Sequence, residues 1–453
     1  MPSSVIDVQA LIDDRKVGRF QISVIILCGL VVLLDGLDTQ VIGYLAPALS
    51  AEWNIPREDL GYILSAGLVG LMVGLLVISP IADRRGRKSA IVASVTLFGF
   101  FTLLTAGAQG PNDLLIYRFL AGVGLGGAMP NALALTAEYC PKRRRATLVI
   151  IMFCGFSLGS IISGILSASL ISQFGWRSVF VVCGALPLLL VPVLVIRLPE
   201  SLHFLITQSK RPDKVGRLIG QLAPDIEMSS FSEFRTEGAA MGVPIAQLFQ
   251  SGRAIGTVLL WVVFFMNLLD FYFLQSWLPT ILTDSGFSQE VAALATTLIS
   301  VGGIVAGILS GTLMDRVGAY NVLATLYVCG VIAVALIGVS VSSLPALLLA
   351  TFGAGFCVSG AQKSVNALSV MFYPTAIRST GVGWALGIGR AGSISGPIVA
   401  GWLIGAGWTT ENLFRLAAVP MLIAAVVVFA MGRLYDGSNE SSPEPSVADS
   451  THE

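Results

Sequence analysis

The chain has 453 residues, of which 55% are hydrophobic and only 12% are charged, and its mean hydropathy is +0.82. Soluble domains carry about twice that charged fraction, so the composition excludes an ordinary soluble protein. The 27 basic and 27 acidic residues cancel, so the net charge gives no reason to expect a nucleic-acid partner.

Apolar stretches long enough to cross a bilayer, which takes roughly 20 residues, follow one another along the chain. There are twelve, at 22–47, 60–82, 89–108, 112–139, 147–172, 177–197, 254–283, 290–314, 320–341, 345–371, 379–406 and 412–433. The polar stretch before the first one lacks the apolar core of a signal peptide. We therefore predict an all-α membrane protein with twelve transmembrane helices in two six-helix halves.

The longest polar interruption divides the predicted helices six and six. The expected organisation is an N-terminal segment at 1–21, a first half at 22–197, a central loop at 198–252, a second half at 253–433 and a tail at 434–453. The tail is acidic and poor in apolar residues, which predicts disorder.

Basic residues are unevenly distributed. Of the 27 Lys and Arg residues, 21 fall on one side of the predicted membrane, three on the other side and three inside the spans. Loops rich in Lys and Arg stay inside the cell, so the basic side is predicted to be cytoplasmic. Both termini and the central loop lie on that side.

The two halves repeat the same landmarks at the same spacing. These are Asp38, Pro47 and Asp83 in the first half, and Asp270, Pro279 and Asp315 in the second. Three matches in register indicate an internal duplication. Twin membrane halves around a midplane site are typical of secondary transporters. Since one chain contains both halves, a monomer is expected to suffice.

Charged side chains inside the predicted spans are the main candidates for functional residues. Each costs roughly 2.5–3.5 kcal/mol at the bilayer centre, so these residues must face a protein-lined, hydrated interior. The acids are Asp35, Asp38 and Asp270, and the bases are Arg118, Lys363 and Arg390. The acids balance the bases, so protonation of one aspartate would free one cation for an anionic substrate.

Four acidic residues are candidates for proton coupling. Asp35 and Asp38 lie three residues apart and share a helix face. Two close carboxylates resist joint ionisation, which suits a proton carrier, although the pair could instead grip neighbouring helices. Asp270 is the repeat partner of Asp38. Glu138, at the inner end of the fourth span, is expected either to pair with Arg143–Arg145 or to act in proton exit.

The basic residues are candidates for substrate binding. Arg118 could bind a carboxylate or neutralise Asp35 or Asp38, and the sequence leaves both possibilities open. Arg390 follows small residues that open space around it, and its guanidinium fork fits a carboxylate. Lys363 is a similar but more ambiguous candidate. The amides at similar depths are Asn131, Asn267 and Gln275. A cavity that combines cations with aromatic side chains would suit a planar aromatic acid.

A dense charge cluster fills the short loop after the second span, Asp83-Arg84-Arg85-Gly86-Arg87-Lys88. It is in part a topology signal. It is also a candidate gate, in which Asp83 pairs with a basic group across the interface between the halves. The predicted gating residues are Asp83, Arg84, Gly86, Arg87, Asp315, Arg316 and Arg378.

Only two histidines are present, His203 and His452, and both lie outside the spans. No metal site and no His-based catalytic group can be assembled from them, and no cofactor is expected. The chain is therefore not expected to be an enzyme.

These motifs resemble those of the major facilitator superfamily. The loop cluster at Asp83, its echo at Asp315 and the glycine run that starts at Arg118 together cover nearly the whole chain. Four further motifs resemble the aromatic acid:proton symporters, a group that includes transporters of 4-hydroxybenzoate. They are Asp35-Gly36-Leu37-Asp38-Thr39, Gly43-Tyr44-Leu45-Ala46-Pro47, Met129-Pro130-Asn131 and Gly387-Ile388-Gly389-Arg390.

The resemblance implies the major facilitator fold in a bacterial inner membrane, with proton-coupled uptake of an aromatic acid. It implies that Asp35 and Asp38 are required for that uptake. It also implies a need for Asp83, Arg118, Glu138 and Arg390, which the residues alone did not establish.

Other functions remain open. Lys363 is an extra cation that would fit a dicarboxylate or a halogenated ring acid. An uncoupled sugar facilitator would need amides and hydroxyls more than six buried charges. A drug:proton antiporter often carries a Gly-Pro pair in its fifth span, where this chain has Gly155-Phe-Ser-Leu-Gly159. A sensor on a transporter scaffold should have a larger cytoplasmic output domain than the central loop.

Overall fold

Long apolar helices make up most of the computed structural model, which describes residues 4–207, 212–223, 231–235, 245–250, 252–374 and 377–435. The first bundle contains α2 (Arg19–Trp53), α3 (Arg57–Arg85), α4 (Arg87–Thr105), α5 (Pro111–Tyr139) and α6 (Lys142–Arg197). The second contains α9 (Ala254–Asp284), α10 (Gln289–Val317), α11 (Ala319–Val339), α12 (Leu344–Phe372), α13 (Arg378–Gly405) and α14 (Thr410–Tyr435). The short elements are β1 (Ser4–Asp7), α1 (Val8–Asp13), α7 (Leu202–Thr207), α8 (Pro212–Leu222), β2 (Phe231–Arg235) and the 3-10 turns η2 (Ile245–Phe249) and η3 (Ser340–Ser342).

Twelve membrane crossings follow from these helices. Within the described residues, ten helices are long and apolar enough to cross a membrane. The helix α6 supplies two crossings, because Gly175 breaks it with a φ of 73°, a left-handed conformation that favours glycine. The helix α13, which carries Arg390 and many glycines, is the remaining crossing. The prediction of twelve transmembrane helices in two halves is confirmed.

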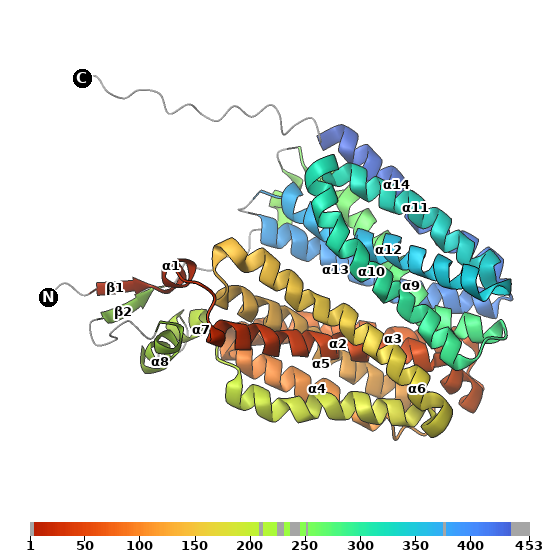
Figure 1. Cartoon of the computed structure of the whole chain (residues 1–453), viewed down its shortest axis with the longest axis horizontal. Coiled ribbons are helices and arrows are strands. Elements are labelled where there is room, and N and C mark those ends of the chain that lie inside the picture. The colour runs from red at the N-terminus through yellow and green to blue at the C-terminus, as the bar shows by residue number, and fades with distance from the viewer. Residues whose placement is uncertain are drawn as a thin grey trace.

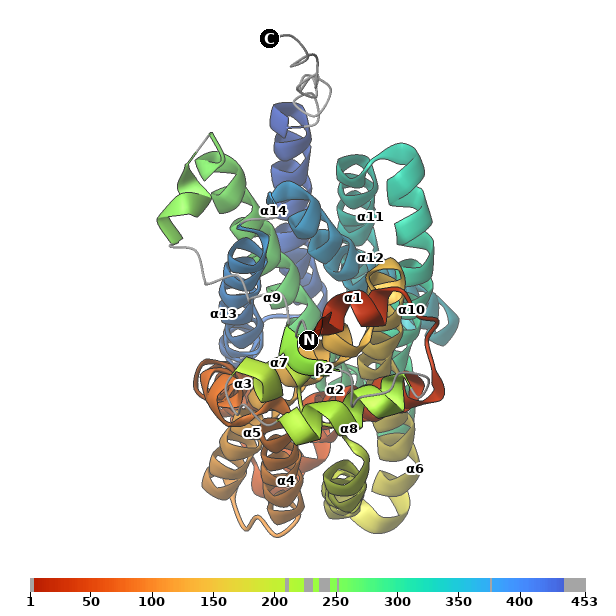
Figure 2. The same ribbon diagram turned by 90° about the vertical axis from the view of Figure 1, so that its left-hand side faces the viewer.

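The crossings form two bundles that lie side by side (Figures 1 and 2). In the first bundle α2 packs on α6, and α3 packs on α5. In the second, α9 packs on α13 and α10 packs on α12. Each bundle therefore has the same pairing of its first helix with its fifth and its second with its fourth, as expected of a duplication.

Glycines let α3 and α5 approach until their main chains touch. A Cβ at Gly70 would lie 3.0 Å from the nitrogen of Val123, and one at Gly122 would lie 3.0 Å from the Cα of Gly67. Real Cβ atoms seldom come that close, so only glycine fits at these positions. Small residues at helix interfaces are the usual basis of tight packing in membranes.

The two ends of the molecule differ. We name the end that carries α1 and the close of α14 the terminal face, and the opposite end the distal face (Figure 1). At the terminal face β1 pairs in parallel with β2, which ties the N-terminal segment to the central loop. Val215 and Ile219 of α8 are buried against the first bundle. The prediction of a disordered tail concerns residues 436–453, which lie outside the described residues.

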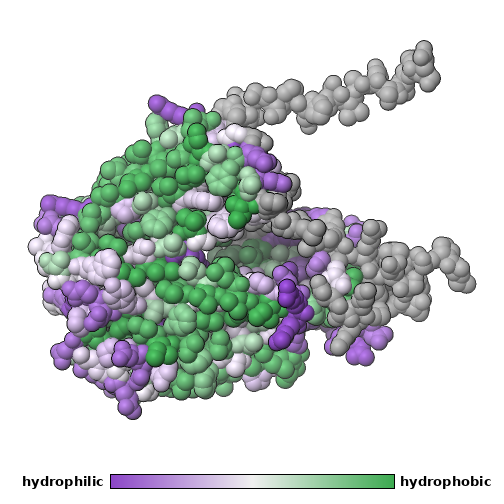
Figure 3. All heavy atoms as spheres, turned by 180° about the vertical axis from the view of Figure 1, so that it is seen from behind, coloured by the Kyte–Doolittle hydropathy of each residue, from purple (hydrophilic) through white to green (hydrophobic). Residues whose placement is uncertain are grey.

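The bundles touch at the distal face and separate towards the terminal face. At the distal end Gly61 of α3 meets Pro397 of α13, and Gly43 of α2 meets Gln275 of α9. Figure 3 shows a hollow between the two bundles that opens on the side where the termini lie. The structure is therefore closed at the distal face and open at the terminal face.

Candidate functional site

An ion pair buried in the first bundle joins α2 to α5. Arg118 Nη1 lies 3.0 Å from Asp38 Oδ1, and its Nη2 donates to the main-chain oxygen of Asp38 at 2.9 Å. Thr102 of α4 donates to the same carboxylate oxygen at 2.5 Å. Asp38 is 0% exposed and Arg118 is 1% exposed. Of the two possibilities for Arg118, the structure shows internal pairing, and substrate contact stays a prediction.

Asp35 has a different environment. Thr39, one turn along α2, donates to its Oδ1 at 3.0 Å. Arg390 of the second bundle lies within electrostatic range of this carboxylate. Arg390 is half-buried and its Nη1 donates to the hydroxyl of Tyr272 at 3.2 Å. The guanidinium of Arg390 therefore bonds a phenol of its own half and lies within electrostatic range of an acid from the other half.

A small cavity of about 10 Å³ lies in the first bundle, and its lining includes Thr39 and Arg118. That is close to the space of one water molecule. Thr39 bonds Asp35 and Arg118 bonds Asp38, so the cavity borders the partners of both carboxylates. The sequence singled out the aspartates but missed Thr39 and Thr102 as their partners, since hydroxyls are common in membrane helices.

Asp270 is isolated in the second bundle. It is 0% exposed, and neither of its oxygens has a hydrogen-bond partner among the described residues. Its neighbour Asn267 donates to the main-chain oxygen of Val358 at 3.1 Å, which links α9 to α12. An ionised carboxylate buried without a partner is very costly, which sets Asp270 apart from the paired Asp38.

The other predicted substrate residues are spread out. Asn131 donates to Gly127 of its own helix at 2.7 Å. Gln275 bonds Ser300 at 3.1 Å, and Ser300 meets Ser160 of the first bundle at 2.7 Å, so this amide belongs to the distal contact between the halves. Lys363 is half-buried in α12 and donates to the main-chain oxygen of Gly303.

The loop cluster at the terminal face folds against the first bundle. Gly86 connects α3 to α4 with a φ of 99°, and a Cβ there would collide with the carboxylate of Glu200. Arg87 forms an ion pair with Glu138. The expected pairing of Glu138 with Arg143–Arg145 is wrong, because α4 packs beside α5 and brings Arg87 to it. Asp83 is exposed, and no ion pair across the halves is described for it in this open conformation.

The remaining predicted gating residues lie apart at the terminal face. Arg84 and Arg316 are exposed. Arg378, at the start of α13, donates from its Nε to the main-chain oxygen of Tyr373 at 3.2 Å. Asp315 lies in the last turn of α10, and its side chain is outside the described part of the structure. Their gating role remains a prediction.

An ion pair that the sequence did not predict, which we name the latch, joins the two halves at the distal face. Arg57 Nη2 lies 2.8 Å from Asp284 Oδ1 and 2.9 Å from Oδ2, and Arg57 also bonds Ser50. Around it, Ser65 donates to the main-chain oxygen of Ile394 at 2.9 Å. We name these contacts, with Ser160–Ser300, the distal seal. The sequence offered one indication of this ion pair: Arg57 is one of only three basic residues on the side of the membrane that is poor in Lys and Arg.

Loss of the latch is expected to loosen the distal seal. The variant Asp284→Asn should raise the rate at which a thiol at position 65 (Ser65→Cys) reacts with a maleimide by about two- to fivefold, because a part-exposed ion pair contributes up to about 1 kcal/mol. The rate is measured on purified protein, with protein lacking the new thiol as baseline. Glu411→Gln breaks a pair with Arg415 inside a single helix and should leave the rate unchanged.

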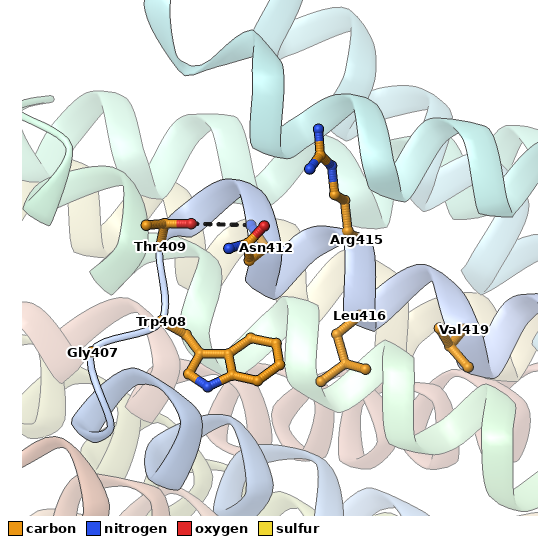
Figure 4. A pocket seen from close by; sticks show the side chains of 7 residues that line it. All are labelled: Gly407, Trp408, Thr409, Asn412, Arg415, Leu416 and Val419. Atoms are coloured by element: carbon orange, nitrogen blue, oxygen red, sulfur yellow. Dashed lines mark hydrogen bonds between the residues drawn. The ribbon is translucent and has the colours of Figure 1, made fainter.

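A hollow elsewhere on the molecule is not part of this site. It lies where α13 passes into α14 and is lined by Gly407, Trp408, Thr409, Asn412, Arg415, Leu416 and Val419 (Figure 4). Its charged residue, Arg415, is paired with Glu411. None of the predicted site residues lines it.

Among the described residues no group of three His, Cys, Asp or Glu side chains could hold a metal ion.

One family model matches the chain twice, and each match covers one of the two bundles. The model described as Major Facilitator Superfamily matches the chain twice, over residues 28–288 and 260–451. Two solved structures have a similar fold. A bacterial homologue of the human lysosomal transporter Spinster, in an inward-facing conformation, has a TM-score of 0.71 at 16% identity, with 95% of this chain and 100% of that chain covered. The xylose transporter XylE from E. coli, in a partially occluded inward open conformation, has a TM-score of 0.68 at 17% identity, with 94% and 100% covered.

Three relatives are similar over nearly their whole length. The 4-hydroxybenzoate transporter PcaK of Pseudomonas putida is 43% identical, with 94% of this chain and 96% of the relative covered. The gallate transporter of Pseudomonas putida is 40% identical, with 94% and 95% covered. The benzoate transport protein of Acinetobacter baylyi is 33% identical, with 98% and 95% covered.

Proposed function

Because the chain belongs to the Major Facilitator Superfamily, a family of membrane transporters, we propose that it imports an aromatic carboxylic acid together with protons. Its named relatives transport 4-hydroxybenzoate, gallate and benzoate, all of which are carboxylic acids on a ring. The observation that carries the proposal is the position of Arg390, a cation from the second half within electrostatic range of Asp35 from the first. The chain is a transporter and not an enzyme.

Competition for Arg390 couples proton to substrate in this proposal. When Asp35 is ionised it compensates Arg390, and an incoming carboxylate has to displace it. When a proton neutralises Asp35, the guanidinium is free to bind the carboxylate through its two-pronged fork. Proton and acid then bind together, which is the requirement for symport. The proton gradient supplies the driving force and no cofactor takes part.

The orientation follows from charge. The terminal face carries the arginine-rich loops, so we assign it to the cytoplasm of a bacterial cell. The distal face then points outward, and the described conformation is inward-facing. The three outward basic residues are all paired with acids: Arg57 with Asp284, Arg177 with Glu52, and Arg415 with Glu411. We expect one chain to work as a monomer, since it holds both halves of the path.

The remaining candidates keep secondary roles in this proposal. Asp38, held by Arg118, and Asp270, which has no hydrogen-bond partner among the described residues, are the further proton carriers, and Glu138 with Arg87 lies at the inner exit. Asn131 and Asn267 line the path near the charges. A symporter of a dicarboxylate is the second candidate, because Lys363 adds a cation that has no acidic partner among the described residues.

Uptake of radiolabelled 4-hydroxybenzoate into cells tests the proposed function. We expect accumulation above the external concentration, and we expect a protonophore to abolish it. An unchanged initial rate and level after collapse of the gradient would rule out proton symport. A dicarboxylate that competes better than 4-hydroxybenzoate would favour the second candidate.

Removal of Arg390 is expected to weaken carboxylate binding selectively. The variant Arg390→Ala should weaken the binding of 4-hydroxybenzoate by about 10- to 100-fold, the usual effect of losing a charged hydrogen-bond partner. The binding of the neutral amide 4-hydroxybenzamide should change far less. Calorimetry on purified protein measures both dissociation constants. Arg415→Ala, which removes an exposed arginine at the distal face, is the matched control, and an equal loss for acid and amide would indicate a structural role for Arg390.

A further inference from the structure

Lys363 differs from the other two cations inside the membrane. Arg118 is paired with Asp38, and Arg390 lies near Asp35. No carboxylate among the described residues pairs with Lys363, whose ammonium donates to the main-chain oxygen of Gly303 in α10. An ammonium has three donors, and this is its one hydrogen bond among the described residues.

A notch in α10 holds the lysine side chain in place. Gly303 and Gly307, one turn apart, both lie against it. A Cβ at Gly307 would be 2.7 Å from the Cδ of Lys363, whereas one at Gly303 would be 3.4 Å from its Nζ. Since any larger residue at 307 would push the lysine stem aside, the glycine fixes where the ammonium stands. At Gly311, one turn further along α10, an added Cβ would meet nothing within 4 Å.

The notch lies next to the distal seal. Ser300, one turn earlier on α10, belongs to the distal seal through Ser160. Because α10 runs from the distal face to the terminal face, Gly303 and Gly307 lie on the terminal side of the seal. Cys154 of α6, in the first bundle, lies within electrostatic range of Lys363.

Lys363 and Arg390 belong to different pairs of helices in the second bundle. Arg390 is on α13 and bonds Tyr272 of α9, whereas Lys363 is on α12 and rests on α10. Figure 2 shows α13 on one side of the second bundle and α10 with α12 on the other. A single ligand that bound both cations would need an oxygen-bearing group at each of its two ends.

We propose that Lys363 is a specificity-determining residue that binds a second oxygen substituent on the ring, opposite the carboxylate held by Arg390. The inference rests on the proposed function. A cation without an acidic partner inside the membrane is costly. A phenolic oxygen would accept a hydrogen bond from the ammonium, and a second carboxylate would neutralise its charge. A ring acid without such a substituent gains nothing from Lys363, so the residue discriminates between ring acids and does not merely attract anions.

The variant Lys363→Met tests this proposal, because it keeps the apolar stem and removes the charge. Uptake into proteoliposomes is measured as a function of concentration for two acids, the hydroxylated 4-hydroxybenzoate and the unsubstituted benzoate. We expect the half-saturating concentration to rise by about tenfold or more for the hydroxylated acid and to change by less than about threefold for benzoate, since a site built to hydrogen-bond a group discriminates strongly against its absence. A similar change for both acids would overturn the proposal.

A matched pair of glycine variants tests the positioning without removing the charge. Gly307→Ala should lower the preference for 4-hydroxybenzoate over benzoate in the same direction as Lys363→Met, because the added methyl displaces the lysine stem. Gly311→Ala should leave the preference unchanged. Equal preferences in the two glycine variants, at equal amounts of folded protein, would overturn the role of the notch. Failure of the unaltered protein to take up either acid would instead refute the proposed function.

Discussion

The variant Asp38→Asn is expected to abolish accumulation of the aromatic acid and to lower the stability of the first half. The carboxylate is fully buried, receives hydrogen bonds from Arg118 and Thr102, and carries the charge that compensates the arginine. An amide at 38 cannot take up a proton, and it leaves a buried guanidinium without a counter-charge. Breaking a buried pair in this way costs about 3–5 kcal/mol. Uptake with a proton gradient and thermal unfolding of purified protein measure the two effects.

A double variant separates the two roles of Asp38. Asp38→Asn with Arg118→Gln removes both charges, so most of the lost stability should return. Accumulation should stay absent, because no proton carrier has been restored. If Asp38→Asn alone accumulated the acid normally, the assignment of Asp38 to proton coupling would be wrong. If the double variant accumulated it, the ion pair would be structural.

The variant Gly122→Val is expected to prevent the first bundle from packing. Gly122 of α5 meets the main chain of Gly67 in α3, where neither helix has side-chain atoms that could move away. Overpacking a tight interface costs roughly 1–3 kcal/mol per site, and a main-chain conflict cannot be relieved by a rotamer change. We expect a large loss of folded protein, measured as the monodisperse fraction after extraction from the membrane and as the unfolding temperature.

The control for this variant is Gly383→Val on α13. That glycine is exposed, and an added Cβ would meet nothing within 4 Å. The same substitution should therefore have little effect on the yield of folded protein. Comparable losses at both positions would mean that valine itself is poorly tolerated, and the close approach of α3 to α5 would then not explain the effect at Gly122.

The architecture could be predicted from the sequence because the bilayer imposes it. A helix must be apolar over a fixed length, so composition alone located all twelve crossings to within a few residues. The duplication was readable from the spacing of Asp38 and Asp270. The short elements outside the membrane helices could not be predicted in this way. The pairing of β1 with β2 involves only a few residues that lie far apart in the chain, and no alternation of apolar and polar residues predicted it.

The partners of the buried charges could not be predicted in the same way. The cost of burying an ion shows that Asp38 and Arg118 need compensation, but it does not say by which residue. That depends on how each helix is rotated about its axis, which tertiary packing decides. Gln275 illustrates the point, since the sequence placed it with the substrate and the structure places it beside the distal seal. The link between Arg57 and Asp284 spans 227 positions, and no local pattern connects them.

The distal seal also acts as an electrical insulator. In the proposed orientation it separates the water outside the cell from Asp35, the proposed proton carrier. Its polar contacts are few, and next to them Tyr44, Ala168 and Ala293 form a small buried apolar cluster. A seal that parted before the terminal side closed would give protons a continuous leak through the bilayer, and the cell would lose membrane voltage without gaining any acid. The close fit of the two halves at this end therefore protects the energy supply of the whole cell as well as the direction of transport.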